Sequence, residues 1–417
     1  MNTTPDELER PVIARGAAVG PADAGGQPVA TGGRAPTVKE LANLDVLRAI
    51  AVGLVLCDHV SETVSPLVGV SLHPWDWLLG RLGVLAFFVH TSLVLMQSLE
   101  RSRLQGAAMF ANFYIRRLFR IYPLSIVCVV LVLVLGVTRV PWEATPPAWT
   151  TTQIVSNLLL IQNLTFSPSV LAPLWSLPYE VQMYVVLPFL FWAARRWAPL
   201  PVALIGWCVA VVAGVVQPII PGLSRLDLAQ FGPCFLAGVV AFALTSRVRP
   251  RLPSTAWVPC LVILALVYVS IAARLEMIHA SWLAWLFCLA LGLLIPCFEQ
   301  VVWKPGKAAA HYLARYSYGI YLGHMVALWL GFGASGPTHL VNGFVVFLGA
   351  LLVFSVGGYH LLEAPLIDVG GRVSRRLCGS APSRRSPAPA TTLAYTAGNP
   401  QQMPPSREAV SPEHPVG

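Results

Sequence analysis

Charged residues are scarce in this sequence. Asp, Glu, Lys and Arg together make up 11% of its 417 residues, whereas hydrophobic residues make up 56%. Soluble domains average about a quarter charged residues, and the chain has no long polar block from which a soluble domain could be built. The composition therefore excludes an ordinary soluble globular protein and predicts an integral membrane protein.

Paired cysteines are also absent, because none of the eight cysteines forms a Cys-x-x-Cys motif. Seven of them lie in apolar segments, where a cysteine behaves as a small buried hydrophobic residue. The sequence therefore predicts neither a disulfide framework nor a zinc site, and no other metal site is expected.

Both ends of the chain lack apolar runs. Residues 1–40 are rich in Gly, Ala and Pro and have no signal-peptide core, so a disordered N-terminal tail is expected. Residues 367–417 are rich in Pro, Arg and Ser and predict a disordered C-terminal tail. A membrane domain is expected over residues 41–366.

Long apolar runs fill this central region. A transmembrane helix needs roughly 20 mostly apolar residues, and about ten segments qualify. They are 43–63, 77–98, 122–140, 174–194, 200–219, 228–245, 255–273, 281–299, 316–335 and 341–362. The expected fold is an all-α, polytopic membrane helix bundle with about ten transmembrane helices. Segment 153–166 is shorter and more polar and is expected to be interfacial or re-entrant.

Basic residues are distributed unevenly between the expected loops. If the N-terminus is cytoplasmic, the inner loops carry thirteen Lys and Arg residues and the outer loops carry three. Positive residues concentrate on the cytoplasmic side of membrane proteins, so both termini are expected in the cytoplasm. The same topology explains the net charge of +9 without a nucleic-acid partner.

The first expected span, "LDVLRAIAVGLVLCDH" at residues 44–59, contains charge at two depths. Eleven residues separate Arg48 from His59, which places them on one helical face about 16 Å apart. Asp45 is close enough in sequence to pair with Arg48. Two interpretations remain open: an end-of-helix ion pair with a satisfied core histidine, or a polar face ending in a histidine that transfers a proton.

Three arginines cluster in "FYIRRLFRIYPL", residues 113–124. Arg116 and Arg120 share a helical face, Arg117 lies beside them, and flanking aromatic residues predict a short helix at the inner interface. Clustered guanidinium groups suit the recognition of phosphate. A topogenic cluster that binds lipid headgroups is the alternative.

Polar residues also recur in the fourth span, within "LWSLPYEVQMY" at residues 174–184. The candidates there are Trp175, Ser176, Glu180 and Tyr184, and the last three share one helical face. A carboxylate inside a membrane needs a partner, and Arg48 or Arg81 could supply the charge for Glu180. Whether that pairing serves chemistry or only structure is left open.

Two further histidines lie in apolar surroundings. His324 follows Tyr321 by three residues in "YSYGIYLGHM", residues 316–325, and a satisfied core histidine is the alternative there. His90 lies in the second span, within "FFVHTSLVLM" at residues 87–96. It is a candidate for a second histidine in a polar cavity, and a change in packing is the alternative.

These segments together resemble the acyltransferase-3 family of bacterial integral-membrane O-acyltransferases. The similar motifs are Leu-Asp-x-Leu-Arg-Ala with Arg-x10-His, Arg-Arg-x-x-Arg-Ile-x-Pro, Trp-Ser-Leu-x-x-Glu-x-x-x-Tyr and Ser-Tyr-x-x-Tyr-Leu-x-His. The second span departs from the family's Phe-Phe-x-x-Ser-Gly, since His90, Thr91 and Ser92 stand there. "LLEAP", residues 361–365, fits the family's ending and is interpreted as helix termination.

The resemblance implies a membrane enzyme of the bacterial cytoplasmic membrane. It would move an acyl group, with acetyl as the first expectation, from cytoplasmic acyl-CoA to a hydroxyl of a sugar or glycosylated acceptor, with no permanently bound cofactor. The implied catalytic residues are His59, Arg48 and Glu180. Arg116, Arg117 and Arg120 would bind acyl-CoA. The implied substrate-binding residues are Asp45, Trp175, Ser176, Tyr184, Tyr321, His324 and His90. A transporter or flippase for a lipid-linked sugar is the alternative, because it could use the same polar face without coenzyme A.

Overall fold

The computed structural model describes residues 42–70, 75–138, 147–220, 228–274, 281–333 and 340–379, all within the unit Leu41–Gly417. Helices account for the regular structure of these residues, apart from one isolated bridge between Leu252 and Phe298. The predicted all-α membrane helix bundle is thus confirmed. The expected N-terminal tail lies outside the described residues.

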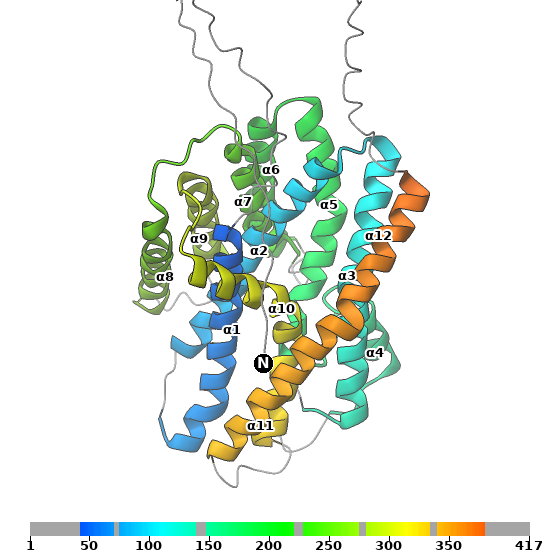
Figure 1. The fold of residues 1–417 in the computed structure, drawn as a ribbon, viewed down its shortest axis with the longest axis vertical. Coiled ribbons are helices and arrows are strands. Elements are labelled where there is room, and N and C mark those ends of the chain that lie inside the picture. Colours follow the sequence, from blue (N-terminus) through cyan, green and yellow to red (C-terminus); the bar gives the residue numbers. More distant parts are fainter. Residues whose placement is uncertain are drawn as a thin grey trace, which may run out of the picture. The chain divides into compact units, whose positions relative to one another are not determined.

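The helices follow one another along the chain as Figure 1 shows. They are α1 (Ala42–Val68), α2 (Trp75–Ser102), α3 (Gly106–Leu135), α4 (Thr151–Leu158), η1 (Ala172–Ser176), α5 (Leu177–Arg196), α6 (Pro199–Val216), η2 (Gln217–Ile219), α7 (Leu228–Thr245), η3 (Ser254–Ala256), α8 (Trp257–Arg274), α9 (Ser281–Leu294), η4 (Ile295–Cys297), α10 (Lys304–Leu328), η5 (Trp329–Gly333), α11 (Leu340–Leu352), η6 (Val353–Gly357), η7 (Tyr359–Glu363) and α12 (Ala364–Cys378).

Five helical stretches in the described residues are long and apolar enough to cross a membrane. They are Leu78–Ser102, Gly106–Leu135, Pro199–Ile219, Ser254–Arg274 and Leu340–Cys378. Two shorter apolar helices, Ala229–Thr245 and Ser281–Cys297, accompany them. A multi-pass membrane protein is therefore supported, but the predicted count of ten spans is not confirmed. Helices α1, α5 and α10 carry the polar side chains of the site described below, which makes their composition less apolar.

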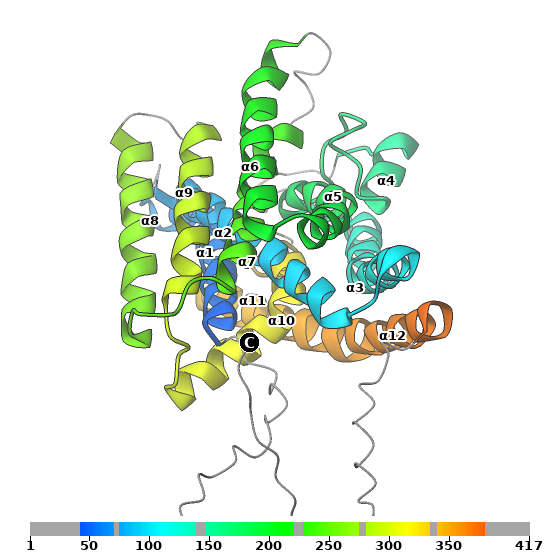
Figure 2. The same cartoon turned by 90° about the horizontal axis from the view of Figure 1, so that it is seen from above.

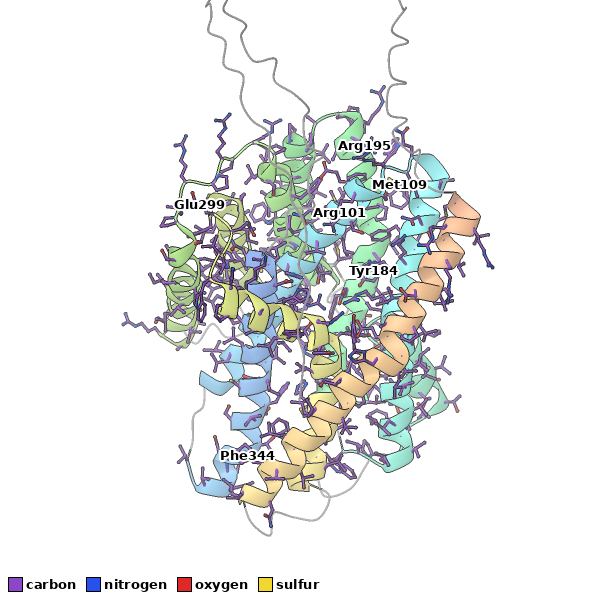
Figure 3. The ribbon with its side chains drawn as sticks, viewed as in Figure 1. Arg101, Met109, Tyr184, Arg195, Glu299 and Phe344 are labelled. Carbon is purple, nitrogen blue, oxygen red and sulfur yellow. The ribbon has the colours of Figure 1, made fainter. Side chains whose placement is uncertain are left out.

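The bundle is organised around α1 and α2. Helix α1 packs against α2 and α10, and α2 also packs against α7, which in turn contacts α6 and α9. Helices α3 and α12 lie side by side in both views (Figures 1 and 2). In Figure 3, Arg101 and Arg195 lie toward one end of the bundle, Phe344 lies at the other end, and Tyr184 lies between them.

Close approach of α1 and α2 depends on a glycine. A Cβ added to Gly83 of α2 would lie 2.5 Å from the carbonyl oxygen of Ala51 in α1 and 2.8 Å from Val55. Backbone atoms cannot yield as a flexible side chain can, so even one methyl group would force the two helices apart. Gly53 of α1 offers the contrast, because a Cβ there would meet nothing within 4 Å.

Gly83→Ala is therefore expected to destabilise the protein by about 1–3 kcal/mol, the usual cost of overpacking a core. Gly53→Ala should be neutral or stabilising by up to about 1 kcal/mol, because alanine favours a helix more than glycine does. Thermal unfolding of the two detergent-solubilised variants measures the difference. Equal unfolding temperatures would contradict the close contact between α1 and α2.

Two segments differ from their sequence-based predictions. The arginine cluster was predicted to lie on a separate short helix. It lies instead on α3, which runs unbroken from Gly106 to Leu135 with Pro123 inside it. A helix of 30 residues is about 45 Å long, more than the roughly 30 Å hydrocarbon core of a bilayer. One helix can therefore contain both the basic cluster and an apolar span.

The C-terminal boundary is the second difference. The prediction of disorder from residue 367 is wrong for residues 367–378, because they form most of α12. This helix is amphipathic, and its buried residues Gly370 and Ser374 lie on the face toward α3. Packing against α3 stabilises a helix that its own composition does not favour. Residues from 380 onward lie outside the described part of the chain.

The polar segment predicted at 153–166 forms α4 and a series of turns. Thr150 and Gln153 make a reciprocal capping box that begins the helix. The buried side chain of Asn157 then donates to the carbonyl oxygen of Pro168 and accepts from the backbone N–H of Val170. These bonds satisfy the backbone of a connection that contains little regular structure.

Candidate active site

A cavity of about 310 Å³ lies among α1, α2, α3, η1, α5, α10 and α12. Its charged lining consists of five arginines and one carboxylate: Arg48, Arg101, Arg116, Arg117, Arg120 and Glu180. Its other polar lining residues are His90, Thr91, Ser98, Ser176, Tyr184, Ser317, Tyr318 and Tyr321. Clustered guanidinium groups with few counter-ions make this a cavity for an anionic ligand.

Nine of the thirteen predicted site residues line this cavity. They are Arg48, His90, Arg116, Arg117, Arg120, Ser176, Glu180, Tyr184 and Tyr321. Residues from five separate stretches of sequence are thus gathered in one place. The other four, Asp45, His59, Trp175 and His324, lie outside the cavity lining.

Arg48 reaches the cavity from α1, and its Nε donates to Ser317 Oγ at 2.6 Å. The ion pair that the spacing of Asp45 and Arg48 allowed is not formed, because Asp45 Oδ2 lies 3.0 Å from His311 Nδ1 of α10 instead. Both Asp45 and His311 are partly exposed, so this contact is a surface pair that contributes little stability. Asp45 and Arg48 of α1 thus contact different residues of α10, His311 and Ser317.

The three arginines of α3 have different partners. Arg116 Nε donates to Asn112 Oδ1 at 2.9 Å, one helical turn away. Arg120 Nη1 lies 3.1 Å from Glu363 Oε1, at the end of η7. Arg117 lies near Tyr184 and Glu180 of α5. All three still line the cavity, so the predicted cluster forms one basic wall.

Glu180 lies inside the cavity on α5. The hydroxyl of Tyr184, one turn later on the same helix, donates to Glu180 Oε1 at 2.5 Å. Arg48, Arg117 and Arg120 are the cations that act on this carboxylate. The suggested alternative partner Arg81 is not among them, and it forms a hydrogen bond with Tyr268 of α8.

Ser176 and Tyr321 close one part of the cavity wall. The hydroxyl of Tyr321 lies 2.7 Å from Ser176 Oγ and donates to the carbonyl oxygen of Pro173 at 2.9 Å. Ser176 belongs to the short helix η1 just before α5, yet it keeps its place on the face shared with Glu180. The edge of the Tyr321 ring also packs with Phe87 of α2.

His59 and His324 form a stacked pair beyond Tyr321. Their ring centroids are 5.1 Å apart with an interplanar angle of 13°, and the Tyr321 ring lies 6.1 Å from that of His324. His324 is 1% exposed, and its Nδ1 donates to the carbonyl oxygen of Ile320. Tyr321 therefore contacts both the arginine-lined cavity and the histidine pair.

Carboxylates surround the other side of His59. Its Nδ1 lies 3.3 Å from Glu62 Oε2 and 3.6 Å from Asp58 Oδ2. The carboxylate of Asp58 is directed at α2, where a Cβ on Gly80 would lie 2.2 Å from Asp58 Oδ2. Glu62 is a residue that the sequence analysis missed, although its position three residues after His59 was a usable signal.

Of the remaining two predicted residues, His90 lines the cavity and Trp175 does not. Trp175 packs on the rings of Tyr179 and Phe231 and is 36% exposed, so it does not line the cavity. His90 is 5% exposed and does line it, as the departure from the family motif suggested.

Other lining residues were not among the predicted site residues. Arg101 was counted only with the basic residues of the inner loops, and Ser317 and Tyr318 open the Ser-Tyr-x-x-Tyr-Leu-x-His motif without having been assigned a role. Glu363 was interpreted as part of a helix end, yet its side chain is fully buried against Arg120. A carboxylate in an otherwise apolar helix was the available signal for Glu363.

The fold and the cavity define a class: a multi-pass helical membrane protein whose polar helices enclose a basic site. Within that class, residues 41–361 match a family model described as an acyltransferase domain, and the chain belongs to the acyltransferase-3 family. No curated protein and no solved structure is matched by the chain. Family membership makes the protein a membrane acyltransferase.

Proposed function

We propose that the protein transfers an acyl group, acetyl in the first instance, from cytoplasmic acyl-CoA to a hydroxyl of a sugar or glycosylated compound. Its place would be the bacterial cytoplasmic membrane, with the N- and C-termini on the cytoplasmic side, as the distribution of basic residues predicts. The observation that carries the proposal is the cavity with five arginines and one carboxylate inside an acyltransferase family domain.

The donor side of the proposed reaction is the arginine-lined cavity. Acyl-CoA carries several phosphate charges at one end and an uncharged pantetheine arm with its thioester at the other. The arginines would bind the phosphates through charge-assisted, bidentate hydrogen bonds. The apolar lining contributed by Val84, Phe87, Phe88 and Val94 of α2 suits the uncharged arm.

His59 is the proposed base. If its Nδ1–H donates to Glu62, the carboxylate fixes the tautomer and leaves Nε2 free to accept a proton. Nε2 then takes the proton of the acceptor hydroxyl as that oxygen attacks the thioester carbonyl. Collapse of the tetrahedral intermediate breaks the carbon–sulfur bond, and the proton passes to the leaving thiolate. Transient acylation of His59 itself is the other route.

The path from the cavity to His59 leads past Tyr321 in this proposal. A thioester that reaches the histidine pair would have to open the hydrogen bond between Tyr321 and Ser176, because both residues line the cavity and the Tyr321 ring also lies beside His324. Arg48 and Glu180 would hold the local charge and the position of the arm. The acceptor would approach the histidine pair from the side of Glu62, whose side chain is 34% exposed.

Purified protein in proteoliposomes, supplied with acetyl-CoA and a carbohydrate extract from its own host, is expected to release free coenzyme A. A thiol reagent measures the release, and mass spectrometry of the extract measures the gain of acetyl groups. A flippase for a lipid-linked sugar would translocate a labelled lipid without releasing the thiol. That result would replace the proposed reaction with its alternative.

A further inference from the structure

Glu363 is buried behind the cavity wall rather than exposed at a helix end. Its side chain has no exposed surface, and its Oε1 lies 3.1 Å from Nη1 of Arg120, which does line the cavity. Glu363 itself is not a lining residue. It thus contacts the cavity through Arg120.

The helix that follows Glu363 is held tightly against the arginine face of α3. A Cβ on Gly370 would lie 2.7 Å from Cβ of Phe119, so a glycine is needed for this contact. One turn later, Ser374 donates to Asn112 Oδ1 at 2.5 Å, and the same oxygen accepts from Arg116 Nε. Two of the three α3 arginines are therefore supported from the side of α12.

The charges in this region explain why such support is needed. Arg48 and Arg120 act on each other as like charges, and Glu363 acts on both with the opposite sign. Without an opposing charge, repulsion would turn the flexible Arg120 side chain away from Arg48. Its guanidinium would then lose the orientation needed to bind a ligand. A buried carboxylate behind Arg120 opposes that repulsion and reduces its rotamer freedom.

We propose that Glu363 is a positioning residue for the donor: it fixes the Arg120 guanidinium at the cavity wall, in register to bind the phosphates of acyl-CoA. This inference rests on the proposed function, because it assigns the anion in the cavity to the donor. Glu363 touches neither donor nor acceptor and acts through Arg120. The C-terminal helix α12 thereby becomes part of the donor site.

Comparing two acyl donors distinguishes a positioning role of Glu363 from a general role in stabilising the fold. Acetyl-CoA carries phosphates, whereas acetylpantetheine has the same thioester and arm without them. Glu363→Gln keeps the shape of the side chain but removes its charge, and we expect it to raise KM for acetyl-CoA about tenfold with kcat little changed. The kcat/KM for acetylpantetheine should stay within about twofold of wild type, and Glu363→Asp should restore part of the lost affinity.

Arg120→Ala and the double variant complete the test. Because Glu363 acts through Arg120, Glu363→Gln should add no further loss once Arg120 is absent. Multiplying effects, or an equal loss with both donors, would mean that Glu363 only supports the fold and would overturn the inference. Where Glu363→Gln does not fold, the same comparison of donors with Glu363→Asp, expected to raise KM for acetyl-CoA about threefold, decides it.

Experiments on the wild-type protein distinguish failure of the proposed reaction from failure of the inference about Glu363. Protein that binds coenzyme A but transfers no acetyl group would contradict the proposed reaction alone, and the Kd of coenzyme A for the same variants would then decide the role of Glu363. Protein that does not bind coenzyme A would overturn both. Titration calorimetry with coenzyme A itself supplies this measurement.

Discussion

His59→Ala is expected to lower acyl transfer by about three orders of magnitude while the protein still folds. Removal of a general base typically costs a factor of about 10² to 10⁴, and removal of a nucleophile costs at least as much. The imidazole is 18% exposed and stacks on His324, so alanine leaves no large cavity in the core. Release of coenzyme A in proteoliposomes, together with thermal unfolding, measures both parts of this expectation.

His311→Ala is the matched control. His311 is exposed, pairs with Asp45 and lies outside the cavity, so its loss should leave transfer within about twofold of wild type. If His59→Ala kept a tenth of the activity or more, His59 would not be the base. His90 would then be the candidate, because it is the histidine that lines the cavity.

Arg117→Ala is expected to raise KM for acetyl-CoA by about 10- to 100-fold with a smaller change in kcat. Hydrogen bonds to charged groups contribute about 1.5–3 kcal/mol each, and this range of binding energy corresponds to that range of KM. Arg117 lines the cavity and lies near both Glu180 and Tyr184 of α5. Steady-state kinetics with varied acetyl-CoA measure the change.

Arg196→Ala provides the control for net charge. Arg196 is exposed in the last turn of α5 and does not line the cavity, so its removal takes one positive charge from the protein without touching the site. Its KM for acetyl-CoA should remain close to that of wild type. Equal effects of the two substitutions would mean that the cavity attracts the donor only through its overall charge, and that Arg117 makes no direct contact.

The spacing of residues along single helices was predictive. Ser176, Glu180 and Tyr184 do share the cavity, and so do Arg116 and Arg120, because positions three or four apart lie on one helical face. The same arithmetic placed Arg48 and His59 on one face of α1, but only Arg48 lines the cavity. The residue that intervenes, Tyr321, comes from α10, far away in the sequence.

Partners across helices were not predictable. Asp45 stands three residues from Arg48 but contacts His311, while Arg48 contacts Ser317, and Glu363 contacts Arg120. Each of these contacts depends on how closely α10 packs against α1, or η7 against α3, at that level of the bundle. Local sequence restricts the direction of a side chain, whereas the identity of the atom it meets depends on packing between distant segments.

The sequence by itself therefore determined the class of the protein, its all-helical character and the basic character of the site. These follow from hydrophobicity and helical periodicity, which are local properties of the chain. Tertiary structure alone decided that α12 is ordered and supports the arginines, and that Tyr321 lies between the cavity and the histidine pair. It did so because those contacts join residues far apart in the sequence, such as Ser374 with Asn112 and Tyr321 with Ser176, which only packing brings together.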